Sequence, residues 1–258
     1  MRDKSFEKEL LSEADRIISA ADAKGITLRL IGAIAIRRHS ETARKEMARD
    51  LTDLDFIGYG KERKKIENSL QELGYVPDWA FNTLHPSNIR FNRNSSELNI
   101  GVDIWLDVFE MCHRFDFAPR LHLDKPTLPI TDLLMTKLQI VQLNEKDVKD
   151  ILSLTLDHEL GENDEDTERI NVKYLQEICG KDWGIYKTFT SSITKIISMV
   201  DSYVLLEEQR ALVKSRLTEL LEKIEKAPKS LSWKLRARIG ERQIWYETPE
   251  QLRHQRTI

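Results

Sequence analysis

Two aspartates, Asp53 and Asp55, stand one residue apart in the segment Arg49-Asp-Leu-Thr-Asp-Leu-Asp-Phe-Ile-Gly. Side chains two residues apart on a β-strand point to the same side, so both carboxylates would share one small space. Carboxylates this close repel each other unless a cation neutralises them. Mg²⁺ suits that task because it binds a few carboxylates and completes its shell with water and substrate phosphates. The pair therefore predicts a site for Mg²⁺, or for Mn²⁺ in its place.

A third carboxylate stands in the segment Val102-Asp103-Ile-Trp-Leu-Asp107-Val. Its alternation of apolar and polar residues predicts a strand that carries Asp103 and Asp107 on the face away from the core. If this strand pairs beside the one with Asp55, Asp103 joins the cluster and Asp107 lies one step farther along. Three acids on two strands can hold two metal ions about 3.5 to 4 Å apart, which suits in-line displacement at a phosphate. The sequence leaves open which of the two is the third metal ligand.

Hydrophobic spacing predicts the elements that position these acids. Apolar residues over 6–21, with Gly25 beyond them, predict a first helix, and residues 26–31 predict a short strand that ends in a turn at Gly32. A helix should follow that turn. Strands are also predicted over 54–59, 89–93 and 97–108, the last two as a hairpin, and a surface helix over 61–73.

From Thr131 onward the periodicity is helical. The predicted helices cover 131–143, 147–158, 172–179, 191–204 and 207–224, and the acidic run over 161–169 should be a solvated loop. A boundary near residues 126–129 fits this change. The predicted fold is α+β, with a mixed α/β domain over 1–128 and a helical domain over 129–258.

This order of parts resembles the nucleotidyltransferase superfamily, which shares its fold with the polymerase beta type. The family has a Gly-Gly or Gly-Ser turn, a downstream Asp-x-Asp pair and a third acid on a neighbouring strand. Here Gly32-Ala33 matches the turn, Asp53 and Asp55 the pair, and Asp103 the third acid. The resemblance implies a mixed sheet flanked by helices. Ala33 departs from the motif, because the family has Gly or Ser at that position.

Minimal and abortive-infection-type members resemble the chain more closely, because their later motif joins a Lys-Leu pair to a downstream Asp-x-x-Asp. Lys137-Leu and Asp147-Val-Lys-Asp150 match that motif. The resemblance implies that Lys137 contacts the triphosphate and that Asp147 or Asp150 holds the lysine. Two structural interpretations stay open: the stem of Lys137 could cover apolar surface, and Asp147 could cap its own helix beside Asn144.

The residues around the Gly32 turn are candidates for nucleotide binding. Backbone N–H groups at Gly32 and Ala33, where the following helix begins, could bind phosphate through the helix dipole. Arg49, four residues before Asp53, could reach a phosphate or pair with an acid. Together with Asp150, these residues form the predicted nucleotide-binding set.

Composition excludes several classes of protein. A formal net charge of -3 does not fit a protein dedicated to coating nucleic acid. Cys112 and Cys179 form no Cys-x-x-Cys pair, which argues against a zinc ribbon or a disulfide scaffold and predicts two buried thiols. No long apolar run exists and charges interrupt the N-terminal segment, so we expect no membrane span, no signal peptide and a cytoplasmic location.

The C-terminal segment mixes basic and aromatic residues. Its members are Lys226, Lys229, Lys234, Arg236, Arg238 and Arg242, interleaved with Trp233, Trp245 and Tyr246. Such a mixture could contact RNA through phosphate charge and base stacking. More often such a pattern belongs to a helix that packs its aromatic residues inward and exposes its charges.

The sequence as a whole predicts a metal-dependent nucleotidyltransferase. It would move a nucleoside monophosphate from a nucleoside triphosphate such as ATP to a hydroxyl of a small molecule, a transfer RNA or a protein. One alternative is a catalytically weak or regulatory member of a toxin-antitoxin type system, which Ala33 favours. Another is a non-enzymatic interaction module, in which Asp53, Asp55 and Asp103 are scattered surface acids.

Overall fold

The structure is a computed structural model that describes residues 4–94 and 99–248. Contacts along the chain divide it into two compact units. The first comprises residues 1–38, 49–109 and 115–128, and the second comprises residues 39–48, 110–114 and 129–258. Two short segments from within the first 128 residues therefore belong to the second unit.

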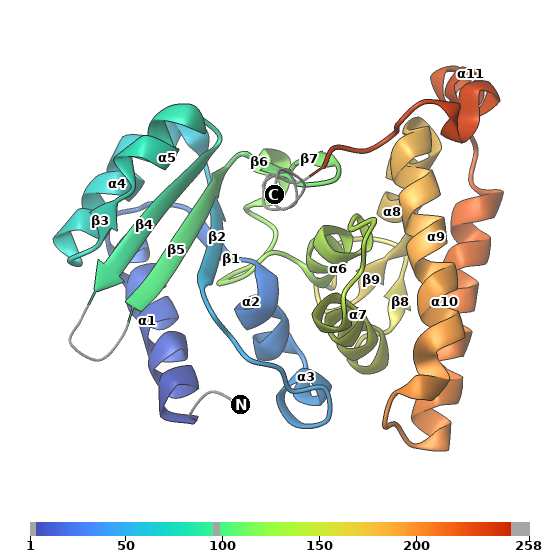
Figure 1. Cartoon of the computed structure of the whole chain (residues 1–258), viewed down its shortest axis with the longest axis horizontal. Coiled ribbons are helices and arrows are strands. Elements are labelled where there is room, and N and C mark those ends of the chain that lie inside the picture. The colour runs from blue at the N-terminus through green and yellow to red at the C-terminus, as the bar shows by residue number, and fades with distance from the viewer. Residues whose placement is uncertain (1–3, 95–98, 249–258) are drawn as a thin grey trace, which may run out of the picture. The chain divides into compact units, whose positions relative to one another are not determined.

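A five-stranded mixed sheet forms the centre of the first unit, in the order β1-β2-β5-β4-β3 (Figure 1). β2 and β5 are parallel, and the other neighbours are antiparallel. The predicted hairpin is present as β4 and β5, and its turn at 95–98 lies outside the described residues. The strands are β1 (Leu28–Leu30), β2 (Leu54–Gly58), β3 (Val76–Pro77), β4 (Asn88–Asn94) and β5 (Asn99–Leu106).

Four helices accompany this sheet: α1 (Lys4–Ala23), α2 (Gly32–His39), α4 (Arg63–Glu72) and α5 (Trp79–Leu84). α1 packs on α4 and on β1, and α5 packs on β4. α1 ends as predicted before Gly25, which has a φ of 64°. α5 was not predicted from the sequence, because its six residues are too few to carry a helical repeat.

Alternation along β5 separates a core face from a polar face. Val102, Ile104 and Leu106 are buried, whereas Asp103 and Trp105 are half-buried. On the neighbouring strands Phe56 and Phe91 are fully buried, and each such side chain contributes roughly 1.5 to 3 kcal/mol through burial. The apolar face thus fixes the register, and the register decides which polar side chains meet on the other face.

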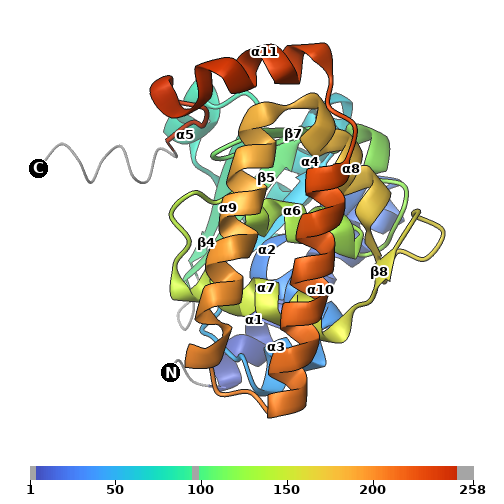
Figure 2. The same ribbon diagram turned by 90° about the vertical axis from the view of Figure 1, so that its right-hand side faces the viewer.

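The second unit is mainly helical, as predicted. Its helices are α3 (Glu41–Lys45), α6 (Ile130–Leu138), α7 (Glu145–Asp157), α8 (Val172–Lys181), α9 (Trp183–Met199), α10 (Glu207–Lys226) and α11 (Leu231–Ile239). α9 packs along α10, and Figure 2 shows the two lying side by side. Two short ladders complete the structure: β6 (Val108–Glu110) with β7 (Arg114–Asp116), and β8 (Leu160–Gly161) with β9 (Ile170–Asn171).

Some helices begin or end at other residues than predicted, and at α9 a capping residue explains the difference. α9 begins eight residues before the predicted start at 191, because the carboxylate of Asp182 accepts a hydrogen bond from Ile185 N at 2.9 Å. α6 ends at Leu138, short of the predicted 143. α3 belongs to the second unit because Asp157, at the end of α7, accepts hydrogen bonds from Thr42 N at 2.9 Å and from Thr42 Oγ1 at 2.6 Å.

Both cysteines are free and buried, as predicted. Within residues 4–94 and 99–248, no helix combines the length and the apolar character needed to cross a bilayer.

Candidate active site

Parallel pairing of β2 and β5 places Asp55 directly opposite Asp103. Both side chains are half-buried and lie on the face of the sheet away from the buried Phe56 and Ile104. Asp53 directly precedes β2 and is exposed, and its carboxylate accepts a hydrogen bond from Thr52 Oγ1 at 2.8 Å. The sequence prediction that β5 lies beside the strand of Asp55 is therefore confirmed, with the qualification that β2 begins one residue after Asp53.

The Gly32 turn packs against Asp55. Gly32 has a φ of 67°, in the left-handed region that favours glycine. A Cβ atom built on Gly32 would lie only 2.6 Å from Asp55 Oδ2. The backbone also joins the two segments, because Ile31 N donates to Asp55 O at 3.0 Å. Only glycine thus meets both demands of this position, the backbone angle and the close approach of a carboxylate.

Arg90 is the member of the site that the sequence analysis missed. It lies opposite Asp103 on β4, and its guanidinium binds that carboxylate through two bonds, Nε to Oδ1 at 2.7 Å and Nη2 to Oδ2 at 2.9 Å. The hydrogen bond that Arg90 donates to Asp103 raises the pKa of Arg90. Burial opposes this shift, and the charges of Asp103, Asp78 and Asp53 add to it. Arg90 is therefore the cation that neutralises Asp103 in this structure.

α5 holds Arg90 in place. The guanidinium carbon lies 4.1 Å from the centroid of the Phe81 ring, a cation–π contact. The Asn82 side-chain amide binds both backbone groups of Arg90: its Oδ1 accepts a hydrogen bond from Arg90 N at 2.6 Å, and its Nδ2 donates one to Arg90 O at 3.1 Å. The sequence predicted the two hairpin strands but not their register, and it is the register that pairs Arg90 with Asp103.

Asp107 is a structural residue of the turn after β5. It has a φ of 61°, and its carboxylate accepts a hydrogen bond from Gly60 N at 3.0 Å. Its backbone carbonyl accepts from Phe117 N at 2.9 Å and from Ala118 N at 3.1 Å. Asp107 is also four residues beyond Asp103, roughly 13 Å along a strand. Between the two acids that the sequence left open, the geometry favours Asp103 as the third carboxylate.

Asp53, Asp55 and Asp103 supply the kind of ligand that a hard divalent cation prefers, and their binding of such a cation stays a prediction. Asp55 and Asp103 offer oxygen atoms from directly opposed positions, and Asp53 adds an exposed carboxylate at the start of β2. Oxygen ligands of this kind suit Mg²⁺ and Mn²⁺. The Gly32 turn leaves room beside Asp55 that a side chain would fill. Asp103 has its oxygens engaged by Arg90, so a cation at Asp103 would compete with that guanidinium.

Lys137 and Asp150 belong to the second unit. Lys137 Nζ lies 2.9 Å from Asp150 Oδ2 and 3.5 Å from Asp147 Oδ1, and the side chains are only 13%, 5% and 8% exposed. Asp147 also completes a capping box with Asn144 at the start of α7. Lys137 thus contacts both acids, and Asp147 at the same time caps α7. The predicted contact of Lys137 with triphosphate stays a prediction.

The other predicted nucleotide-binding residues lie in the first unit. Ala33 is half-buried in the first turn of α2. Arg49 is half-buried, and its backbone carbonyl accepts a hydrogen bond from Arg37 Nη1 at 3.4 Å. Arg37 itself pairs with Glu7 at 2.6 Å. Nucleotide contacts of Ala33 and Arg49 stay predictions.

A scan of family models and a search of curated proteins found no match to this chain. A search of solved structures found, among others, the solution structure of the antibiotic-resistance factor ANT(2'')-Ia, with a TM-score of 0.38 and 14% sequence identity. The alignment covers 67% of this chain and 94% of that one. At this TM-score the likeness does not bear on function. The strand order, the Gly32 turn and the opposition of Asp55 to Asp103 are features of the first unit itself and do not depend on this likeness.

Proposed function

We propose that this protein is a metal-dependent nucleotidyltransferase that transfers a nucleoside monophosphate from a nucleoside triphosphate to a hydroxyl. The observation that carries the proposal is the placement of Asp55 opposite Asp103, with Asp55 packed against the Gly32 turn. Asp53, Asp55 and Asp103 are the residues that would hold Mg²⁺ or Mn²⁺. When bound, the metal would neutralise phosphate charge and favour ionisation of the attacking hydroxyl.

The transfer itself is a displacement at the α-phosphorus, in which the protein's own residues would bind the phosphates and accept the proton. The acceptor oxygen forms a bond to the α-phosphorus, the bond from that phosphorus to the β-phosphate oxygen breaks, and pyrophosphate leaves. The proton of the acceptor hydroxyl goes to a carboxylate of the site or to solvent. Backbone N–H groups at the start of α2 would bind phosphate, and Arg49 would add positive charge for the triphosphate.

A second candidate is a regulatory protein that binds nucleotide without transferring it. The pairing of Arg90 with Asp103 favours it, because both oxygens of the third carboxylate already have a cationic partner. Ala33 favours it too, since the hydroxyl or the extra backbone freedom of the family's turn is missing. In this candidate the site would bind triphosphate and metal, and no label would move to an acceptor.

One experiment separates the two candidates. The protein is incubated with each nucleoside triphosphate labelled at the α-phosphate, with Mg²⁺ or Mn²⁺ and a cell extract that supplies acceptors. Asp53→Ala/Asp55→Ala is the inactive variant, and Asp116→Ala, which removes an exposed acid from the same unit, is the matched control.

Label transfer that persists in Asp116→Ala and disappears in the double variant would support the transferase. Metal-dependent triphosphate binding without transfer would favour the regulatory candidate. Absence of any metal-dependent triphosphate binding would contradict both.

A further inference from the structure

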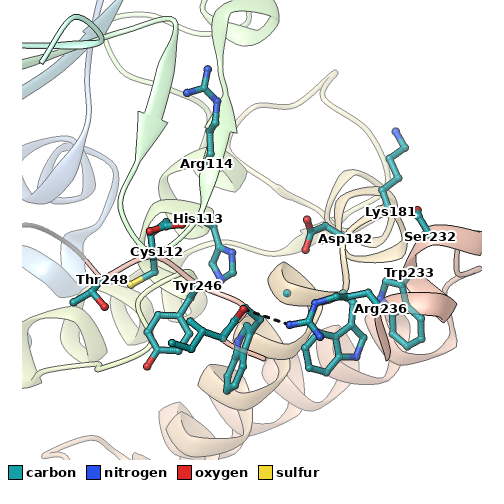
Figure 3. A pocket seen from close by; sticks show the side chains of 15 residues that line it. Cys112, His113, Arg114, Lys181, Asp182, Ser232, Trp233, Arg236, Tyr246 and Thr248 are labelled. Atoms are coloured by element: carbon teal, nitrogen blue, oxygen red, sulfur yellow. Dashed lines mark hydrogen bonds between the residues drawn. The ribbon is translucent and has the colours of Figure 1, made fainter. Parts of the chain in front are cut away.

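The basic and aromatic C-terminal segment forms one wall of a pocket within the second unit (Figure 3). The pocket has a volume of about 710 Å³, and its lining includes Lys181, Trp233, Tyr246 and Arg114. Small-molecule sites usually measure roughly 300 to 1,000 Å³ and combine aromatic rings with a few polar groups. The segment thus makes a concave surface of ligand size instead of a simple exposed helix face.

The wall is fixed by specific hydrogen bonds. Trp245 Nε1 donates to Thr188 Oγ1 at 3.1 Å, and Glu247 N donates to Cys112 O at 2.9 Å. The Arg236 guanidinium donates to Gly240 O at 2.7 Å and to Gln243 O at 2.8 Å. These bonds hold the segment after α11 against the rest of the unit, so the pocket exists before any ligand binds.

Three of the polar side chains at this pocket already serve the fold. Arg236 binds the backbone carbonyls of its own segment and lies over the Trp183 ring, 4.6 Å from its centroid. Asp182 caps α9. His113 is buried with Nε2 2.7 Å from Thr188 Oγ1, and burial lowers its pKa to about 4, so it is neutral at pH 7. None of the three is the natural partner of a charged ligand.

The lining also offers aromatic surface and two exposed cations, Lys181 and Arg114, beside the exposed carboxylates of Asp182 and Glu247. The Trp233 and Tyr246 rings are half-buried, so part of each is accessible. Lys181 is exposed, and Arg114 is exposed with only a surface pair to Glu110 at 3.2 Å, which is worth little in water. In Figure 3 Arg114 and Lys181 lie above the Tyr246 and Trp233 rings and apart from each other. An apolar ligand would leave the cations unused, whereas a planar anion uses both features.

We propose that this pocket binds a nucleobase together with its phosphate. The base would stack on the aromatic rings, and the phosphate would pair with Lys181. The same chemistry is offered by the end of a single RNA strand and by a free nucleotide. The binding goes beyond the proposed transfer reaction, because it needs neither a metal nor the carboxylates of the first unit.

The test measures binding in EDTA, where metal-dependent transfer cannot occur. Fluorescence anisotropy of a labelled single-stranded oligoribonucleotide is titrated with the whole chain, with AMP as competitor and an RNA duplex of the same length as comparison. The expected result is binding to the single strand that weakens as salt rises and exceeds binding to the duplex. Competition by AMP identifies a free nucleotide as sufficient, and its absence identifies the strand end; either outcome supports the pocket.

Matched variants locate the binding. Tyr246→Ala should weaken it roughly ten-fold through lost stacking, whereas Tyr246→Phe should retain it. Lys181→Glu should also weaken it about ten-fold, and Lys195→Glu, an exposed lysine on α9 away from the pocket lining, should not. Folding of each variant is checked by circular dichroism. Equal binding by all four variants, equal binding of strand and duplex, or no binding to the unmodified chain would overturn the proposal.

Discussion

Gly32 is the residue on which the geometry of the candidate site depends most directly. Gly32→Ala should abolish metal-dependent triphosphate binding, because the new Cβ would approach Asp55 Oδ2 to 2.6 Å. The carboxylate would have to move away from its position opposite Asp103. Triphosphate binding in the presence of Mn²⁺, measured by calorimetry, checks this.

Gly25→Ala is the matched control for that substitution. Gly25 has a comparable φ of 64°, and nothing lies within 4 Å of a Cβ built on it. Both variants should lose about 1 kcal/mol of stability from the strained backbone, but only Gly32→Ala should lose triphosphate binding. Equal binding by the two variants would show that Asp55 does not depend on the turn.

Arg90 sets the charge at the third carboxylate. Arg90→Ala should bind Mn²⁺ about ten-fold more tightly than the unmodified chain, because the guanidinium that holds both oxygens of Asp103 no longer competes with the metal. Arg93→Ala removes an arginine from the same strand that pairs with Glu13 instead, and it should leave Mn²⁺ affinity unchanged. Mn²⁺ titration followed by electron paramagnetic resonance measures both. Weaker binding in Arg90→Ala would mean that Arg90 positions Asp103 for the metal.

At the scale of elements, the ion pair of Lys137 with Asp150 joins α6 to α7. Lys137→Met should destabilise the second unit by about 3 kcal/mol, because two buried carboxylates would lose their cation. Urea unfolding followed by tryptophan fluorescence gives the change. Lys149→Met, which breaks the pair with the exposed Glu145 on the same helix, should leave the stability nearly unchanged.

The result also bears on the predicted contact of Lys137 with triphosphate. A loss of stability in Lys137→Met would establish a structural role for the lysine. Unchanged stability together with weaker triphosphate binding would instead point to a direct contact with nucleotide and would contradict the structural expectation.

At the scale of the whole molecule, His113 lies in residues 110–114, a short segment from the middle of the chain that belongs to the second unit. His113 N donates to Gln139 Oε1 at 2.8 Å, and burial lowers the His113 pKa to about 4, while the charge of Asp182 opposes this shift. An unfolded histidine has a pKa near 6.5, so as the pH falls the unfolded state binds a proton that the folded state does not yet bind. The contribution of His113 to stability is therefore complete above pH 6.5 and is lost as pH falls toward 4.

His113→Gln should reduce this acid sensitivity. Between pH 7 and pH 5, the free energy of unfolding should fall by roughly 2 kcal/mol less in the variant than in the unmodified chain. His158 is also buried with a lowered pKa and contributes in the same direction in both proteins, so the comparison isolates His113. His122→Gln, an exposed histidine, should follow the unmodified chain. Parallel pH profiles for all three proteins would contradict the expectation.

The sequence by itself determined the elements and their order. Strict alternation in β5 and the spacing of Asp53 and Asp55 are local properties, because a strand repeats every two residues whatever surrounds it. The same holds for α1 and its end before Gly25, and for the change to helical periodicity after the first domain. Short pieces such as α5 carried no repeat and were not predicted.

Only the tertiary structure decided which of these residues meet. The parallel register of β2 and β5 set Asp103 opposite Asp55, and the hairpin register gave Asp103 its partner Arg90. The turn after β5 engages Asp107, whose carboxylate accepts a hydrogen bond from Gly60 N. Registers and loop closures depend on the packing of residues far apart in the chain, and a one-residue shift would reverse every side chain of a strand. The sequence therefore determined what the site is made of, and the packing of the sheet decided how its charges are paired.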